Sequence, residues 1–468
     1  MPFTTYRYVA FLGLTLLFTQ LVRGKAREWG LLLLSFVFYA AWDPRYVPLL
    51  LGLGVFTYVA GHACAKKGSP SSRLWLPIAA ILFVLGLYKY SGMVVEAVNL
   101  ALPKASALGV PSFVLPLGIS FFTFECVSYL LDVRKGSKEL VPLHRFLLFP
   151  AFFPHMIAGP ILRVREFGPQ LEKPHTATSA EVLAGVDRIV VGFLKKLVIA
   201  DTLGAFVDSG FGSSVAPGAL DGWVLSIAFS FQIYFDFSAY SDIAIGSARA
   251  LGFTFPENFN LPYHAKNPSE FWNRWHMTLS RWIRDYLFLP VLMKQGRPKW
   301  FPLVYTVIVM SLMGLWHGAG LTFVCWGAWH GLLMVGHRLV QGPVAKRSKS
   351  AQRYLDALGR AATLLLIFAG STFFRSRSMG QALGMLGSMF TLKGLRPAYS
   401  PNDYGFLLGS ILVYLLLEPR LLRWFAKKPD EAGVDGWRFW LRAPLYALAL
   451  QFVFMFEHTN VGFIYFQF

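Results

Sequence analysis

The sequence predicts an all-α polytopic membrane protein. Hydrophobic residues make up 55% and charged residues only 15% of its 468 residues, whereas a soluble domain carries about 25% charged residues. Apolar stretches recur from residue 9 to residue 468 without a long polar gap. This composition excludes an ordinary soluble enzyme, and it also excludes a disordered chain, which lacks the apolar surface that offsets the entropy of ordering. We therefore expect a single membrane domain over residues 1–468.

Apolar segments along the whole chain are the expected membrane helices. They lie near residues 8–22, 28–42, 47–62, 74–92, 112–131, 144–162, 189–207, 222–240, 302–316, 321–340, 361–374, 405–418 and 440–457. Several are shorter than the ~20 residues that a perpendicular helix needs to cross a bilayer. We expect roughly 11 transmembrane helices plus re-entrant or interfacial helices, because irregular backbone at membrane depth must lie inside protein or beside water. No small-residue cleavage site follows the first segment, which is therefore expected to be a span and not a signal peptide.

Basic residues predict the orientation of the chain. The 44 Lys+Arg exceed the 25 Asp+Glu and give a net charge of +19, which in a soluble chain would suggest nucleic acid as a partner. Here every second short loop is basic, as the positive-inside rule requires, so we expect no nucleic acid. The loops expected in the cytoplasm contain Arg23, Lys25, Arg27, Lys66, Lys67, Arg73, Arg134, Lys135 and Lys138. The N-terminus and residues 93–111 are then expected outside the cytoplasm.

Residues 255–300 break the apolar pattern. This stretch mixes charged residues with Phe and Trp, which is typical of a segment lying at the membrane interface. Ser269 is the expected N-cap of one helix here, since Phe271, Trp275 and Trp282 share a face at helical spacing. Pro290 is expected to end that helix.

Common catalytic and metal-binding motifs are absent from the sequence. It contains no G-x-S-x-G, Walker loop, H-E-x-x-H or G-x-G-x-x-G. Cys64, Cys126 and Cys325 are widely spaced and form no C-x-x-C, so neither a disulfide framework nor a thiolate metal site is expected. Any chemistry must therefore use another group of residues.

Three histidines flanked by Trp and Gly are the candidates. His276 follows Trp275, His317 follows Trp316, and His330 follows Trp329. An interhelical hydrogen bond is the structural alternative for each of them. No carboxylate recurs at ligand spacing, so we expect no metal. A histidine can take a proton near neutral pH because its ordinary pKa is about 6.5, which favours general-base work.

Several longer motifs resemble the membrane-bound O-acyltransferase family. The matching stretches follow the family's order and spread over residues 36–468. They are Pro116-Leu117-Gly118-Ile119-Ser120-Phe121-Phe122-Thr123-Phe124, Pro154-His155-Met156-Ile157-Ala158-Gly159-Pro160, Phe235-Asp236-Phe237-Ser238-Ala239-Tyr240-Ser241-Asp242, Phe271-Trp272-Asn273-Arg274-Trp275-His276-Met277, Gly314-Leu315-Trp316-His317-Gly318 and Phe463-Ile464-Tyr465-Phe466. Within the family, the sequence is most similar to the bacterial branch that contains the alginate O-acetylation and teichoic acid D-alanyl transfer membrane proteins.

The resemblance implies a fold, a site and a reaction. The fold would be a ring of helices around a central tunnel. His317 matches the family's nearly indispensable histidine, His276 its first histidine or asparagine, and His330 a recurring position of the alginate type. His317 would remove the proton of a hydroxyl group that attacks an acyl thioester, while His276, with Asn273, would orient the acceptor or polarise the carbonyl. The tunnel wall is expected to include Trp275, Trp316 and Trp329, which would exclude water.

The same resemblance implies partners and a location. We expect a multi-pass protein of the bacterial inner membrane, with no bound cofactor and with an acyl thioester, acetyl-CoA in the favoured case, as co-substrate. The acceptor would be a polysaccharide outside the cytoplasm or a periplasmic acetyltransferase-like protein. D-alanyl transfer from a carrier protein is the alternative within the family. A transporter is the alternative from another class, since buried histidines also serve proton relays, although no internal repeat supports it.

Two carboxylates lie in the apolar stretch 232–245 and are expected to need ion-pair partners. Asp236 and Asp242 would be costly if unpaired. We expect them to form ion pairs with Arg274, Arg281 or Arg284, and less readily to contact substrate.

Overall fold

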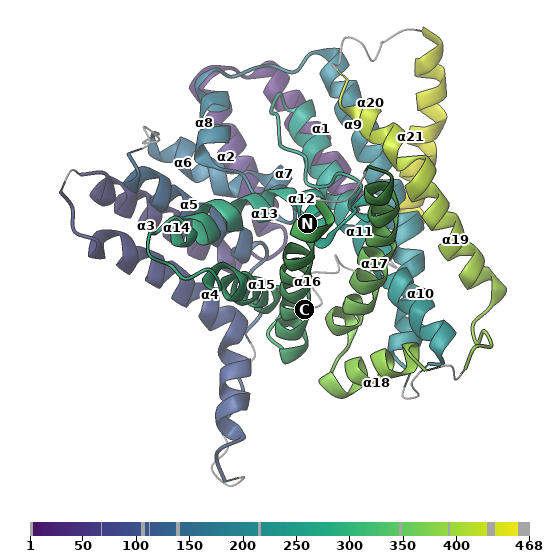
Figure 1. Ribbon diagram of the computed structural model, residues 1–468. Coiled ribbons are helices and arrows are strands. Elements are labelled where there is room, and N and C mark those ends of the chain that lie inside the picture. The colour runs from purple at the N-terminus through teal and green to yellow at the C-terminus, as the bar shows by residue number, and fades with distance from the viewer. Residues whose placement is uncertain are drawn as a thin grey trace. The chain divides into compact units, whose positions relative to one another are not determined.

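The computed structural model contains helices and no strands in the part of the chain that it describes. The described residues are 3–66, 68–103, 108–111, 113–136, 141–213, 217–345, 349–391, 394–427 and 436–456, with side chains described except at 342–354, 436–441 and 456. Lys67, Lys138 and the motif Phe463-Ile464-Tyr465-Phe466 lie outside these ranges. Each predicted apolar segment that the structure describes falls on one or more helices, which confirms the all-α class (Figure 1).

Contacts between residues divide the chain into two compact units. The first comprises Met1–Phe193, Tyr240–Glu257 and Lys428–Asn460, and the second comprises Leu194–Ala239, Asn258–Lys427 and Val461–Phe468. The first unit contains α1 (Tyr6–Leu21), α2 (Gly24–Ala40), η1 (Pro44–Tyr46), α3 (Val47–Ala65), α4 (Ser72–Asn99), α5 (Ile119–Arg134), α6 (Leu143–Ala151), α7 (Phe153–Met156), α8 (Val164–Glu172), α9 (Ser179–Leu194, all but its last residue) and α21 (Gly436–Phe456). Its core includes the fully buried rings of Tyr8, Phe38 and Phe153.

The second unit contains the three candidate histidines. Helix α11 (Ala219–Ala250) begins in this unit and ends in the first. The other elements of the second unit are the π-helical turn η3 (Lys195–Ala200), α10 (Asp201–Phe211), the 3₁₀ turn η4 (Pro262–His264), α12 (Pro268–Arg274), α13 (Met277–Ile283), the π-helical turn η5 (Arg284–Phe288), α14 (Leu289–Leu292), α15 (Phe301–His317), α16 (Leu321–Ala345), α17 (Lys349–Arg375), α18 (Met379–Met389), α19 (Pro401–Leu416) and α20 (Glu418–Phe425).

Helices α15 and α16 pack at the distance that only glycine permits. A Cβ atom at Gly314 of α15 would overlap the carbonyl oxygen of Phe323, and one at Gly327 of α16 would overlap that of Met310. Small residues allow this close backbone approach between apolar helices. The reciprocal contact fixes the register of the two helices, and that register determines where His317 of α15 and His330 of α16 lie.

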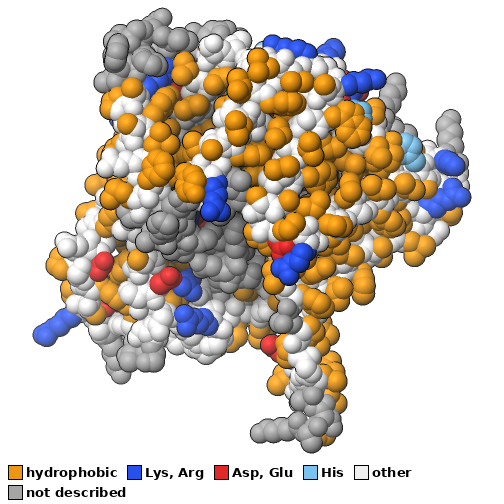
Figure 2. Space-filling model, turned by 180° about the vertical axis from the view of Figure 1, so that it is seen from behind, with side chains coloured by type: hydrophobic (Ala, Val, Ile, Leu, Met, Phe, Trp, Pro, Cys, Tyr) orange, Lys and Arg blue, Asp and Glu red, His pale blue; other side chains and the backbone are white. Residues whose placement is uncertain are grey.

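Four helical stretches are long and apolar enough to cross a membrane among the residues that the structure describes. They are Pro44–Ala65, Ser72–Asn99, Leu355–Arg375 and Pro401–Phe425, and shorter apolar helices cover Phe301–His317 and Arg442–Met455. Hydrophobic side chains cover much of the face shown in Figure 2. On α4, Leu76 and Phe83 are 69% and 70% exposed, as expected for side chains that face lipid. The protein is therefore a membrane protein, and the number of 11 transmembrane helices stays a prediction.

The interfacial segment differs from its prediction in three respects. Asn267, not Ser269, is the N-cap, since its side chain accepts a hydrogen bond from the backbone N–H of Glu270. The single expected helix is two helices, because His276 interrupts it with φ 42° and ψ 55°. Pro290 does not end the helical run but occupies the first turn of α14, where a missing N–H is tolerated.

Candidate active site

His317 is the last residue of α15. It is buried, and its ring lies 4.7 Å from the ring centroid of Trp316, 5.1 Å from that of Trp326 and 5.3 Å from that of Phe374. The next residue, Gly318, leaves the helix with extended backbone, and a Cβ there would overlap the ring of Phe323. The glycine thus lets α16 close over the end of α15 and hold the imidazole among aromatic rings.

His276 lies at the break between α12 and α13. Its left-handed backbone is uncommon for a residue with a side chain and costs of order 1–3 kcal/mol, and such strain is concentrated at functional sites. The ring is buried and contacts Phe237 edge-on at 4.6 Å. Burial lowers the pKa of His276 to about 3, so its imidazole is neutral at pH 7.

Trp316 connects the two histidines predicted to be catalytic. Its indole lies 4.7 Å from the ring of His317 and 6.5 Å from the ring of His276. These residues come from α15 and from the α12–α13 break, 41 positions apart in the sequence. The fold thus brings His276, Trp316 and His317 together, as the sequence motifs predicted.

His330 joins the same group through a second tryptophan. Trp326 lies 5.1 Å from His317 and 4.8 Å from His330, and Trp272 lies 5.2 Å from His330. Nδ1 of His330 has no hydrogen-bond partner among the described residues. We call His276, Trp316, His317, Trp326 and His330 the histidine–tryptophan cluster. The described residues hold no group of three or more His, Cys, Asp or Glu arranged to bind a metal ion.

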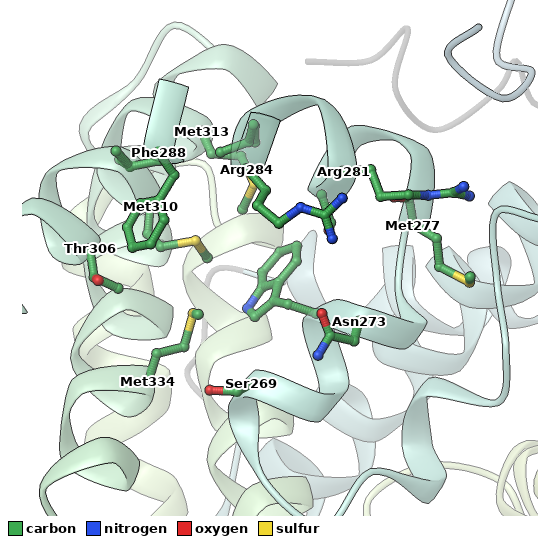
Figure 3. Close-up of a pocket in the computed structure, with 14 residues that line it drawn as sticks. Ser269, Asn273, Met277, Arg281, Arg284, Phe288, Thr306, Met310, Met313 and Met334 are labelled. Carbon is green, nitrogen blue, oxygen red and sulfur yellow. The ribbon is translucent and has the colours of Figure 1, made fainter. Parts of the chain in front are cut away.

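A pocket of about 360 Å³ lies beside this cluster and contains Asn273 in its lining (Figure 3). From α15 it is lined by Thr306, Val309, Met310 and Met313, and from the other helices by Ser269, Trp272, Asn273, Met277, Ser280, Arg281, Ile283, Arg284, Phe288 and Met334. His317 is four residues after Met313 and so continues the pocket-lining face of α15. Trp272 lines the pocket and also contacts His330.

One of the expected tunnel tryptophans, Trp329, lies apart from the histidines. Trp329 donates its indole N–H to the carbonyl oxygen of Leu366 at 2.9 Å and faces α17. Trp275 packs on Phe259 and Phe271, with centroids 5.1 and 5.6 Å away, and it lines a small cavity together with Trp326 and His330. Trp272 and Trp326 also touch the histidines, and the prediction did not name either. For Trp326 the signal was available, because it lies four residues before His330 on α16 and therefore one helical turn away.

The two carboxylates of α11 are paired, but with other partners than predicted. Asp236 forms an ion pair with Lys196 at 2.8 Å within the second unit, and Asp242 forms one with Arg188 at 2.8 Å within the first. The expectation of Arg274, Arg281 or Arg284 was wrong. The partners lie on α9 and η3, where a π turn lets consecutive Lys195 and Lys196 reach carboxylates on different helices.

Comparison with known proteins places the chain in a family. The family model of the membrane-bound O-acyltransferases matches residues 117–380. The chain is 37% identical to the "Probable alginate O-acetylase AlgI" of Pseudomonas aeruginosa over 88% of this chain and 82% of that protein. It is 30% identical to the peptidoglycan O-acetyltransferase of Helicobacter pylori over 98% and 95% of the two chains. It is 33% identical to the teichoic acid D-alanyltransferase of Bacillus subtilis over 47% and 58%.

Apolar helices and a matching acyltransferase model define a membrane-embedded transferase of acyl groups. The chain belongs to the membrane-bound O-acyltransferase family and is an O-acyltransferase of the polysaccharide O-acetylation type. The family match includes all three histidines of the cluster, which lie within residues 117–380.

Proposed function

We propose that this protein moves an acetyl group from a cytoplasmic thioester across the bacterial inner membrane to a polysaccharide, or to a periplasmic carrier protein, on the outer side. The observation that carries the proposal is the position of His317, which ends the face of α15 that lines the pocket. A thioester bound in the pocket would lie along the face of α15 that ends at His317. His317, His276 and Trp316 are the residues proposed to meet the reacting atoms.

The proposed reaction begins with attack of the acceptor's hydroxyl oxygen on the thioester carbonyl carbon. His317 takes the hydroxyl proton as the C–O bond forms. The C–S bond then breaks, the thiolate leaves, and the proton on His317 passes to its sulfur. Trp316 and Trp326 surround His317, and their rings would keep out water that competes for the thioester.

The pocket is the proposed site of the donor. Its walls from α15 and α16 carry Met310, Met313 and Met334, which suit an apolar acyl arm because methionine adapts its shape. Arg281 and Arg284 lie on the α13 side (Figure 3). Guanidinium groups bind phosphate oxygens in a bidentate way, so this side would receive the phosphates of a donor such as acetyl-CoA.

D-alanyl transfer is the second candidate. It is favoured by the similarity to the teichoic acid D-alanyltransferase, which covers 47% of this chain. Similarity to the alginate O-acetylase covers 88% of the chain, which supports acetyl as the group transferred. The transporter alternative has no comparable support, because the family is one of transferases.

Analysis of cell-surface esters in a strain that lacks the gene tests the function. Mild base should release less acetate from the polysaccharides of that strain, and the wild-type gene should restore it while His317→Gln should not. Loss of ester-linked D-alanine with unchanged acetate would overturn the acetyl proposal in favour of the second candidate. Unchanged amounts of both would overturn O-acylation of polysaccharide altogether.

The direction of transfer depends on the orientation of the chain. Leu100, after α4, is 91% exposed, and Lys66, after α3, is also exposed. In a protein with its three cysteines replaced, an impermeant thiol reagent should label Leu100→Cys in cells with a permeabilised outer membrane and should not label Lys66→Cys. Labelling of Lys66→Cys alone would show that the orientation is inverted. The residue pair is matched because the two positions flank the same helix.

A further inference from the structure

The segment around Asn258 crosses the α12–α13 break and is hydrogen-bonded to it on both sides. The backbone N–H of Asn260 donates to the carbonyl oxygen of Arg274 at 2.9 Å, and the N–H of Met277 donates to that of Asn258 at 2.9 Å. The two segments thus pair across His276. Asn258 is completely buried at this crossing.

The side-chain oxygen of Asn258 accepts hydrogen bonds from Thr278. The backbone N–H of Thr278 donates to Oδ1 at 3.3 Å and the Thr278 hydroxyl donates to it at 2.9 Å. A backbone N–H can only donate, so the atom that faces Thr278 is the amide oxygen and not the amide nitrogen. The donor in this contact is a backbone N–H, so the contact fixes which end of the Asn258 amide carries the oxygen, an assignment that atom positions alone do not give.

The same oxygen lies 3.0 Å from Nδ1 of His276. An unprotonated Nδ1 would place its lone pair against an oxygen that can only accept. Nδ1 must therefore carry the proton and donate it to Oδ1, and in a neutral imidazole the lone pair then belongs to Nε2.

From this geometry we infer that Asn258 is a positioning residue that holds His276 as the Nδ1–H tautomer, so that Nε2 accepts a hydrogen bond from the acceptor's hydroxyl group. The inference rests on the proposed function, in which His276 meets the reacting atoms. It also decides between the two roles open to His276. A neutral imidazole with its proton on Nδ1 has no N–H at Nε2 with which to polarise the thioester carbonyl, so orientation of the hydroxyl is the role that remains.

Backbone strain at the crossing fits this positioning role. Leu261 with φ 48° and His276 with φ 42° are the non-glycine residues of positive φ in the described part of the chain, and both belong to this crossing. Left-handed backbone at such residues persists only where the surroundings impose it. The hydrogen bonds from Met277 and Thr278 to Asn258 supply that constraint directly after His276.

Nitrogen NMR of the protein labelled with ¹⁵N-histidine tests the tautomer directly. The chemical shifts of the two ring nitrogens differ between Nδ1–H and Nε2–H imidazole, and the signal missing from His276→Gln identifies His276. We expect wild-type protein at pH 7 to show the Nδ1–H form. We expect Asn258→Leu, which has a similar side-chain volume and no acceptor, to lose that preference. An Nε2–H imidazole in the wild-type protein would overturn the inference.

A conservative variant distinguishes positioning from a purely structural role. The carboxylate of Asn258→Asp keeps an oxygen that can accept hydrogen bonds from Nδ1–H of His276 and from Thr278. Asn258→Asp should therefore retain acetyl transfer, whereas Asn258→Leu should lose it. Three groups that the structure places against His276, namely Phe237, Trp316 and Asn258, are uncharged. A new carboxylate should raise the pKa of His276 by 1–3 units and create a loss of activity on acidification in the range of about pH 4–6. A profile of Asn258→Asp identical to wild type would overturn the inference.

The activity measurement uses thiol release from acetyl-CoA by membrane vesicles that still contain the cell's own acceptor. Tyr404→Phe is the matched control, because it removes a 2.5 Å hydrogen bond to buried Asp221 in the same unit. It should lower thermal stability without moving the pH profile. Full activity of His276→Gln would contradict the proposed role of His276, while an NMR result of Nδ1–H would still support the tautomer, so the two failures are distinguishable.

Discussion

Two buried polar clusters of the second unit differ in what surrounds their titratable groups, which is countercharges in one cluster and aromatic rings in the other. The lysine–carboxylate cluster, made of Lys195, Lys196, Asp201, Asp236 and Glu418, is built from charge pairs. Lys195 lies 2.6 Å from Glu418, and Lys196 lies 2.6 Å from Asp201 and 2.8 Å from Asp236. The histidine–tryptophan cluster instead holds three imidazoles against aromatic rings. Charges paired with one another stabilise the fold, whereas imidazoles held among aromatic rings can exchange a proton with a substrate.

The largest effect expected from this difference is the loss of transfer in His317→Gln. Removal of a general base typically costs 10²–10⁴-fold in rate, and the polar, similar-sized glutamine should leave the melting temperature in detergent close to that of wild type. Ester content of the polysaccharide and melting temperature should be measured on the same preparations. Near-normal esterification by a well-expressed variant would show that His317 is not the base, and a parallel loss of stability and activity would show a structural histidine.

Lys195→Met should lower stability and leave transfer unchanged, which is the opposite of the result expected for His317→Gln. It leaves Glu418 buried without its cation, and breaking a buried pair costs about 3–5 kcal/mol of unfolding free energy. Transfer per folded molecule should be unchanged because neither residue contacts the histidine–tryptophan cluster in the described contacts. The double variant Lys195→Met/Glu418→Gln is the control and should recover most of the stability. A stable single variant that has lost transfer would contradict the division into two roles.

Acid should destabilise the protein through His276, which lies outside the four helices long enough to cross a membrane. Its folded pKa of about 3 is below the ordinary value of about 6.5. The unfolded chain therefore binds a proton first as the pH falls below about 6.5, and stability decreases until the pH reaches about 3. Between pH 7 and pH 5 this amounts to about 2 kcal/mol. Melting curves of wild type and His276→Gln should diverge over this interval, and parallel curves would refute the assignment.

The smallest effect is expected from His330→Phe. A phenyl ring keeps the contacts with Trp272 and Trp326, and aromatic pairs are worth about 0.5–1.5 kcal/mol. We therefore expect less than about a tenfold loss of transfer, milder than for His317→Gln or His276→Gln. Thiol release under identical conditions gives the ranking. A loss as large as that of His317→Gln would place His330 among the reacting groups.

Sequence periodicity predicted the helices well because apolar runs in a membrane protein are forced to satisfy their backbone hydrogen bonds locally. It failed at His276, where the pattern of Phe271, Trp275 and Trp282 continues across a break that only φ reveals. It also failed for the partners of Asp236 and Asp242. Those partners are distant in sequence, and any of several basic residues would have satisfied the same requirement for a countercharge.

The sequence by itself determined the helical membrane class, the acyltransferase family and the identity of the three histidines, since composition and local motifs carry that information without knowledge of packing. The tertiary structure decided which tryptophans touch those histidines and which side-chain oxygen holds His276. Trp329 adjoins His330 in the chain yet faces α17, because neighbouring residues on a helix point in different directions. Asn258 lies 18 residues from His276, and only the crossing of the two segments makes its amide oxygen the acceptor for Nδ1.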